Sequence, residues 1–209
     1  MNIIVVLTVF SLLFLGELGD KTQLIVFNIS LEHEKKYKVG VGATLGFALI
    51  VTLGVVLGTV ITQFIPLTLI SLISGIVFVL IGVIDARNIK PLYIEYKKKD
   101  DLSENNNGLE EELDSKFSKI RNNPYLAGFG FISLMELGDK TQILTITLAS
   151  TYNLPVEVWI GSFLALISLA WIGVFAGALI ARKVPKFHLK VISVAIFIII
   201  GLVVIITSI

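Results

Sequence analysis

Six long apolar segments constrain the fold of this chain more than any other feature of its sequence. They span residues 3–31, 39–62, 67–84, 125–150, 156–181 and 187–208. An α-helix of about 20 residues crosses a hydrocarbon core of roughly 30 Å, and it satisfies its backbone hydrogen bonds within the lipid. The composition agrees, because 55% hydrophobic residues in a chain of 209 are too many for a soluble domain. We therefore predict an all-α membrane protein with six transmembrane helices.

The first segment is longer than one straight crossing requires. As an unbroken helix, residues 3–31 would extend about 43 Å, so this segment must tilt strongly or break. Gly16 and Gly19 mark the expected break. The segment lacks the basic start and small-residue cleavage site of a signal peptide, so we expect it to be retained.

Basic residues are concentrated between alternate apolar segments. Fifteen of the 17 lie within 32–38, 86–123 and 182–190, and the other two are Lys21 and Lys140. Because Lys and Arg favour the cytoplasmic ends of membrane spans, we expect these three connections in the cytoplasm and both termini outside. The segment 86–123 mixes both charge signs with Asn and Ser, which predicts a solvated linker.

The sequence also contains an internal duplication. "ELGDKTQ" at 17–23 recurs at 136–142, and at this offset of 119 five of the eight glycines in 17–85 fall on another glycine. We therefore divide the chain into a first repeat (1–85), a cytoplasmic linker (86–123) and a second repeat (124–209). Each repeat has three spans, an odd number, so the second should enter the membrane from the opposite face. This predicts two inverted three-helix repeats with a shared site near the midplane.

The repeated motif places two acids and one base among apolar residues. Charges at membrane depth are costly and normally face a partner, a cavity or a bound ion. On an unbroken helix the three charged side chains would share one face. A closed Glu–Lys salt bridge within each helix is the simplest alternative, but it leaves one acid of each copy unpaired. The four acids are Glu17, Asp20, Glu136 and Asp139, and the charge-balancing bases are Lys21 and Lys140.

The charge of the two motifs together matches a divalent cation. Four carboxylates and two ammonium groups leave −2 when all are ionised. Oxygen donors favour hard ions such as calcium, magnesium and manganese, and the absence of cysteine makes zinc and copper poor candidates. Further donors are Thr22, Thr141, Gln23 and Gln142. On an unbroken helix Thr22 and Gln23 point away from Glu17, so they can join the site only if the helix unwinds near Gly19 or if they bind neighbouring helices. The two glutamines could instead form interhelical hydrogen bonds.

Glycines in the second span of each repeat predict close helix packing. "GVGATLG" at 40–46 has the look of a dinucleotide-binding loop, but it lies inside an apolar span. Small residues let membrane helices approach closely. We therefore expect a packing role beside the site for Gly42, Gly58, Gly161 and Gly177.

The duplicated motif resembles E-x-G-D-(K/R)-(T/S), the signature of the Gdt-type membrane proteins within the wider cation/calcium exchanger group. "ELGDKT" matches it at 17–22 and at 136–141. The resemblance implies a multi-pass cell-membrane transporter that exports manganese or calcium from the cytoplasm in exchange for protons. The two acids of each motif would form the metal site. The implied partners are the transported divalent cation, protons and the lipid bilayer, with no permanently bound cofactor and no nucleic acid. The oligomeric state stays open.

Two other function classes compete with this one. A passive cation channel could use the same carboxylates. An intramembrane aspartyl protease is suggested by "LGD" at 18–20 and 137–139, although the preceding Glu in both copies departs from that pattern. Only an exchanger requires metal and protons to move in opposite directions.

Overall fold

The computed structural model describes residues 1–18, 20–87, 89, 123–183 and 186–208, and side-chain surroundings for these except 21, 24–25, 176–183, 186 and 188–189. All regular structure in this described part is helical, which confirms the all-α prediction. Most of the predicted linker, 86–123, lies outside the described residues. The helices are α1 (Ile3–Glu17), α2 (Lys21–Leu31), α3 (Lys36–Phe64), α4 (Leu67–Arg87), α7 (Pro124–Glu136), α8 (Lys140–Tyr152), α9 (Pro155–Lys183) and α10 (Lys186–Ser208).

The helix boundaries repeat with the sequence. α9 begins and ends 119 residues after α3, and α7 and α1 end at the equivalent Glu136 and Glu17. Local signals fix several of these ends. Asn2 caps α1 by accepting a hydrogen bond from the Ile4 amide, and Asn123 caps α7 from the residue before Pro124. The same local instructions, written twice, produce the same four helices in each half.

Both motif-containing segments break at the motif. α1 ends at Glu17 and α2 begins at Lys21, and the equivalent break separates α7 from α8. In each break the aspartate amide donates to the carbonyl of the glutamate three residues earlier, at 3.1 Å in the first copy and 3.2 Å in the second. Gly138 has a φ of +83°, which favours glycine. The prediction of a break in the first segment is confirmed, whereas the shared helical face of the motif charges is wrong because no helix runs through the motif.

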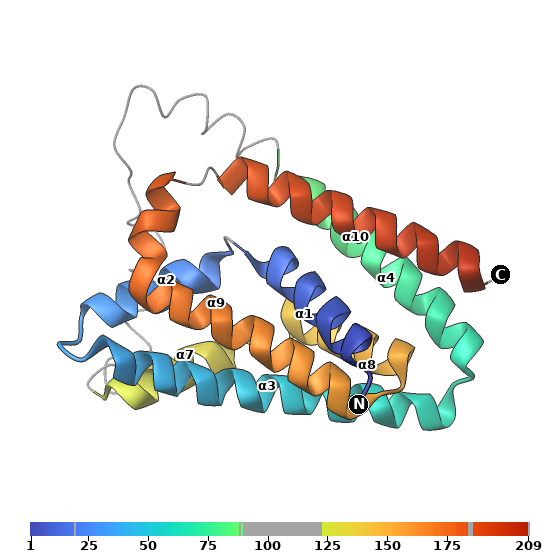
Figure 1. Cartoon of the computed structure of the whole chain (residues 1–209), viewed down its shortest axis with the longest axis horizontal. Coiled ribbons are helices and arrows are strands. Elements are labelled where there is room, and N and C mark those ends of the chain that lie inside the picture. Colours follow the sequence, from blue (N-terminus) through green and yellow to red (C-terminus); the bar gives the residue numbers. More distant parts are fainter. Residues whose placement is uncertain (19, 88, 90–122, 184–185, 209) are drawn as a thin grey trace.

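Equivalent helices of the two halves run antiparallel. Along α3 and α9, Thr52 accepts a hydrogen bond from the Trp159 ring at 2.9 Å, and Gly40 lies against the ring of Trp171. The residue numbers rise on one helix as they fall on the other. The pair α4 and α10 is antiparallel as well. Gly75 lies close to Gly201, and Gly82, further along α4, lies against Ile198, which is earlier on α10. Figure 1 shows α4 and α10 side by side, leading in opposite directions.

Each long central helix packs against the broken helix of the other half. α3 packs on α7 and α8, while α9 packs on α1 and α2. Gly42 lies against the carbonyl of Tyr125 on α7, and its equivalent Gly161 lies against the carbonyl of Val6 on α1. Tyr125 and Val6 are themselves equivalent positions, 119 residues apart. At this contact the two halves therefore pack symmetrically to the level of single residues.

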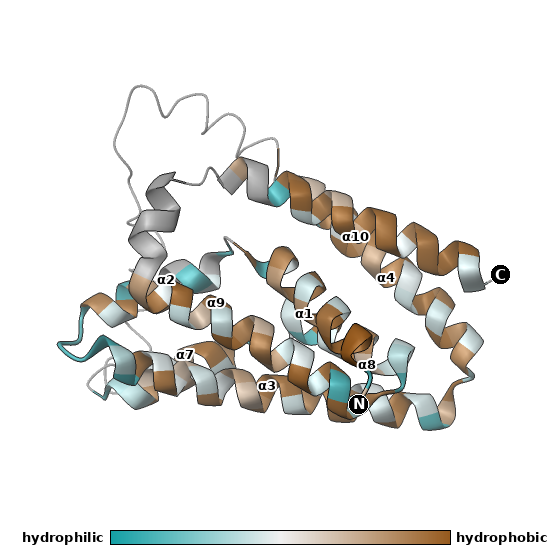
Figure 2. Cartoon of the chain, viewed as in Figure 1, coloured by the Kyte–Doolittle hydropathy of each residue, from teal (hydrophilic) through white to brown (hydrophobic). Residues whose placement is uncertain are grey.

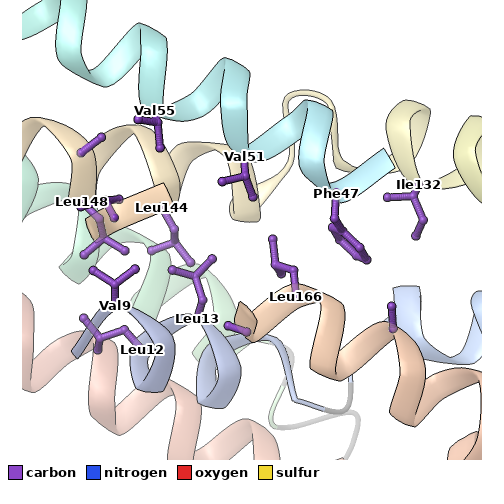
Figure 3. Close-up of a cluster of buried hydrophobic side chains, with 14 of the residues drawn as sticks. Val9, Leu12, Leu13, Phe47, Val51, Val55, Ile132, Leu144, Leu148 and Leu166 are labelled. Carbon is purple, nitrogen blue, oxygen red and sulfur yellow. The ribbon is translucent and has the colours of Figure 1, made fainter. Parts of the chain in front are cut away.

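A shared apolar core joins the two halves. Figure 3 shows side chains from α1, α3, α7, α8 and α9 gathered in one cluster. Its members Phe47 on α3 and Leu166 on α9 are equivalent positions that meet from opposite halves. Lipid is as apolar as these side chains, so close van der Waals packing rather than removal from water stabilises the contact between the halves in a bilayer.

The outer surfaces of the helices are apolar as well (Figure 2). Among the described residues, four helical stretches are long and apolar enough to cross a membrane: Lys36–Phe64, Leu67–Arg87, Pro155–Phe175 and Lys190–Ser208. These long apolar helices indicate that the chain is an integral membrane protein. The predicted count of six crossings requires each broken helix pair to count as one, and it stays a prediction.

Candidate cation-binding site

A small cavity lies between the two helix breaks. Its polar lining comes from both motifs, and its apolar walls come from α2, α3 and α9. The polar residues are Glu17, Asp20, Thr22, Gln23, Glu136 and Thr141, and the apolar ones are Val26, Phe47, Leu166, Leu169 and Ala170. Six of the eight predicted ligands therefore face one cavity. Thr22 and Gln23 reach it because the first helix unwinds before them.

Glu136 is the most deeply buried acid of this cavity. It is the last residue of α7 and is 2% exposed. Thr22, from the other half, donates a hydrogen bond to its Oε1 at 2.7 Å. Its Oε2 is buried and has no hydrogen-bond partner within the described residues. A buried carboxylate oxygen without a donor is costly unless a cation or proton binds it.

Glu17 occupies the equivalent position at the end of α1. It is 5% exposed, and its backbone carbonyl accepts a hydrogen bond from the Gln23 amide nitrogen at 3.3 Å. Gln23 thus bridges the break in its own half while also lining the cavity. This hydrogen bond links α1 to α2, and a ligand role for Gln23 stays a prediction.

Lys140 crosses from the second half to the acids of the first. Its Nζ lies 3.5 Å from Glu17 Oε1 and 3.6 Å from Asp20 Oδ2. It also donates to the Gly16 carbonyl at 2.9 Å, a group left free by the end of α1. The positive charge of Lys140 therefore balances acids of the other half, not those of its own motif. The side chain of Lys21 lies outside the described residues.

The second motif uses two of its polar groups to shape the backbone. Asp139 caps α8 by accepting from the Lys140 amide at 2.8 Å, and Gln142 accepts from the Gly138 amide. Neither is among the described residues that line the cavity. The cavity therefore has three motif carboxylates: Glu17, Asp20 and Glu136.

Three of the predicted packing glycines contact the broken helices, several residues away from the breaks themselves. Gly42 and Gly161 contact α7 and α1 as described above, and Gly58 lies against the Ile146 carbonyl and Ala149 on α8. A methyl group at any of these three would collide with the neighbouring helix. The surroundings of Gly177 are outside the described residues.

The oxygen donors suit a hard cation, but they are not yet arranged as a coordination shell. Within the described residues, no group of three His, Cys, Asp or Glu side chains is close enough to hold one metal ion. Lys140 provides the positive charge next to Glu17 and Asp20. Binding one ion to all three cavity acids therefore requires these side chains to move together.

Two charged residues beside the site are not predicted as part of it by the sequence. Asp85, near the end of α4, is 7% exposed, and its Oδ2 lies 3.6 Å from Lys140 Nζ. Its Oδ1 pairs with Lys190 of α10 at 2.8 Å. By sequence alone, Asp85 would pair with Arg87 at the membrane interface, and Lys190 would belong to a cytoplasmic connection. The sequence signal for Asp85 is only that this acid directly follows the apolar run 67–84.

Comparison with known proteins identifies relatives over most of the chain. Residues 5–90 and 124–209 match the family described as "Divalent cation/proton antiporter GDT1". A GDT1-like protein of Synechocystis sp. is 28% identical over 183 residues, which cover 84% of each chain. A Vibrio cholerae protein named "Putative manganese exporter" is 36% identical over 64 residues, 29% of this chain and 32% of that one. No solved structure matches this chain.

Proposed function

Because the chain belongs to the GDT1 family of divalent cation/proton antiporters, we propose that it exports manganese or calcium from the cytoplasm in exchange for protons. The family is one of transporters, which leaves the intramembrane protease hypothesis without support. The family also matches each half separately, in agreement with two repeats. The Vibrio cholerae relative's name favours manganese as the first ion to test.

The observation that most supports this proposal is the buried Oε2 of Glu136. It faces a cavity that also receives Glu17, Asp20 and Thr22, and it lacks a hydrogen-bond donor among the described residues. Carboxylate and hydroxyl oxygens are the ligands that manganese and calcium take. The proposed site is the cavity between the two breaks, with Glu17, Asp20 and Glu136 as its primary ligands.

The proposed membrane arrangement is two inverted repeats in the cell membrane. Its support is the antiparallel course of α3 and α9 and of α4 and α10, since equivalent helices of inverted repeats run in opposite directions. Each broken helix pair would make one crossing, for six in total. The basic connections and the linker would face the cytoplasm, and both termini would face outward.

Proton coupling follows from the same carboxylates. Burial disfavours the charged form of an acid, and a bound divalent ion favours it. Metal binding should therefore release protons, and protons should compete with metal, so apparent metal affinity falls as pH falls. With a site charge of −2, about two protons would replace one ion. A proton gradient directed into the cytoplasm would then drive metal outward.

The test is transport by the purified protein in liposomes. Manganese, calcium and magnesium are offered in competition, with a pH gradient imposed or collapsed and a pH-sensitive dye enclosed. We expect inward metal flux to carry protons out of the liposome, so that the enclosed dye reports a rise in pH, and to slow when the pH gradient is collapsed. Metal flux without proton movement, in the absence of sodium, would contradict exchange. A rate independent of the gradient would instead identify a channel.

A further inference from the structure

We propose that Asp85 is a positioning residue that accepts the Lys140 ammonium when a divalent cation binds Glu17 and Asp20. The inference rests on the proposed function, since it concerns the same cavity. It adds a residue outside the duplicated motif, because the position equivalent to Asp85 in the second half is Val204. The partner of Asp85, Lys190, is equivalent to Ser71. This ion pair therefore has no counterpart in the duplication.

The Lys140 ammonium is placed among three carboxylates. The distances from its Nζ are 3.5 Å to Glu17, 3.6 Å to Asp20 and 3.6 Å to Asp85. A divalent cation bound to Glu17 and Asp20 would repel this ammonium strongly, since both would lie in a poorly solvated cavity. Lys140 is itself only 14% exposed. It cannot simply turn to water, so it needs a buried acceptor.

Asp85 has the free capacity for that role. Its Oδ1 is held by Lys190 at 2.8 Å, which fixes the carboxylate on α4. Its Oδ2 is buried and has no hydrogen-bond partner within the described residues. A short movement of Lys140 would shift its charge from Glu17 and Asp20 to this oxygen. The ring of Phe197, 5.9 Å from Nζ, lies beside the ammonium and would remain a contact.

The charge count is compatible with this role, because the Asp85–Lys190 pair is neutral and leaves the −2 of the other four groups unchanged. Glu17, Asp20, Glu136 and Asp85 carry four negative charges, and Lys140 and Lys190 carry two positive ones. The group is left at −2, so one divalent cation brings it to zero. Without Asp85, a cation in the site would leave the buried Lys140 charge without a partner, which is costly at membrane depth.

The test compares the metal KM of four variants in the liposome assay. In Asp85→Asn, Lys140 has only Glu17 and Asp20 as partners, so we expect the KM to rise about tenfold, within the usual range of coupling between sites. The maximal rate should change much less. Asp85→Glu should restore most of the affinity, because it restores the acceptor. Asp85→Asn also leaves the Lys190 ammonium without its carboxylate partner. The double variant Asp85→Asn/Lys190→Gln removes both charges of the pair, and its metal KM should be raised to the same extent.

Lys190→Gln alone is the matched control. It removes the α4–α10 ion pair but leaves Asp85 for Lys140, so its KM should stay at or below that of the native protein. A raised KM in Lys190→Gln equal to that of Asp85→Asn would overturn the proposal, because the pair would then be merely structural. So would a native KM in the double variant. If the native protein moves no metal, the proposed function itself fails, and that result is separate from these.

Discussion

The two helix breaks have the same seven residues and different surroundings. In the first break, Glu17, Asp20, Thr22 and Gln23 all line the cavity; in the second, only Glu136 and Thr141 do so among the described residues. The difference comes from α4 and α10. α10 packs on α1 and α4 packs on α8, while the equivalent contacts, α4 with α7 and α10 with α2, are slight or missing in the described part of the chain.

This comparison shows that identical motifs acquire different roles from their neighbours. Ser193 of α10 donates to the Gly16 carbonyl at 3.3 Å, at the end of α1, and Phe197 lies directly against Gly16. Asp85 of α4 reaches Lys140. The α4–α10 pair therefore packs on α1 at the first break and on α8 at the second, and not to the same extent on the equivalent helices α7 and α2. A transporter with inverted repeats requires such an asymmetry, because a fully symmetric molecule would be open to both sides or to neither.

The largest effect is expected at Glu136, the most deeply buried acid of the cavity. Glu136→Gln removes a buried ligand charge, and we expect metal transport to fall by at least about 100-fold, since one missing charge costs several kcal/mol at a desolvated site. Transport into liposomes measures this. The control is Glu34→Gln, an exposed acid in the connection between α2 and α3, which should transport normally. Native rates in Glu136→Gln would remove this acid from the site.

The second prediction tests whether the difference between the breaks is permanent. Asp20 lines the cavity and Asp139 caps α8. If the two breaks exchange roles during transport, Asp20→Asn and Asp139→Asn should both lower the transport rate severely. The residual rates of the two variants should then agree to within about threefold. Transport by Asp139→Asn at close to the native rate, with Asp20→Asn inactive, would mean that only the first break ever binds metal.

A third prediction concerns the packing that is equal in the two halves. Alanine at Gly42 or at Gly161 would place a methyl group against the Tyr125 or the Val6 carbonyl. We expect each to destabilise the folded protein by about 1–3 kcal/mol, and by similar amounts. The apparent melting temperature of the solubilised protein measures this. Val41→Ala, at an exposed position of α3, should have little effect. Clearly different decreases in melting temperature for the two variants would show that these equivalent contacts do not contribute equally to stability.

The smallest effect is expected at Gly138. Its φ is +83°, and no described atom lies within 4 Å of the place that an alanine methyl group would occupy. The cost of Gly138→Ala is therefore backbone strain alone, about 1–2 kcal/mol. Gly138→Asn should be milder, because asparagine tolerates this conformation. Thermal melting of both variants measures the difference. Equal melting temperatures for the alanine variant and the native protein would indicate that the turn relaxes.

Much of this fold could be predicted from the sequence, because the signals that determine the helices are local and recur in both repeats. The apolar runs predict the helices, and the motif glycines predict a break in the first segment. The cavity position of Thr22 depends on that break, so the sequence predicts it only conditionally. Asp85 could not be assigned to the site, because its contact with Lys140 depends on how α4 packs against α8. Spacing along the chain holds no information about that contact.

The position of Lys140 has a consequence for how the protein is made. Glu17 and Asp20 enter the bilayer early in synthesis, and the base that pairs with them in the finished molecule is encoded 120 residues after Asp20. The first repeat therefore lacks this base until the second repeat has been made. A product truncated within the linker would hold acids at membrane depth without Lys140 or the α9 glycines, and we expect quality-control proteases to remove it. We therefore expect the first repeat to become stable only when the second repeat has assembled with it.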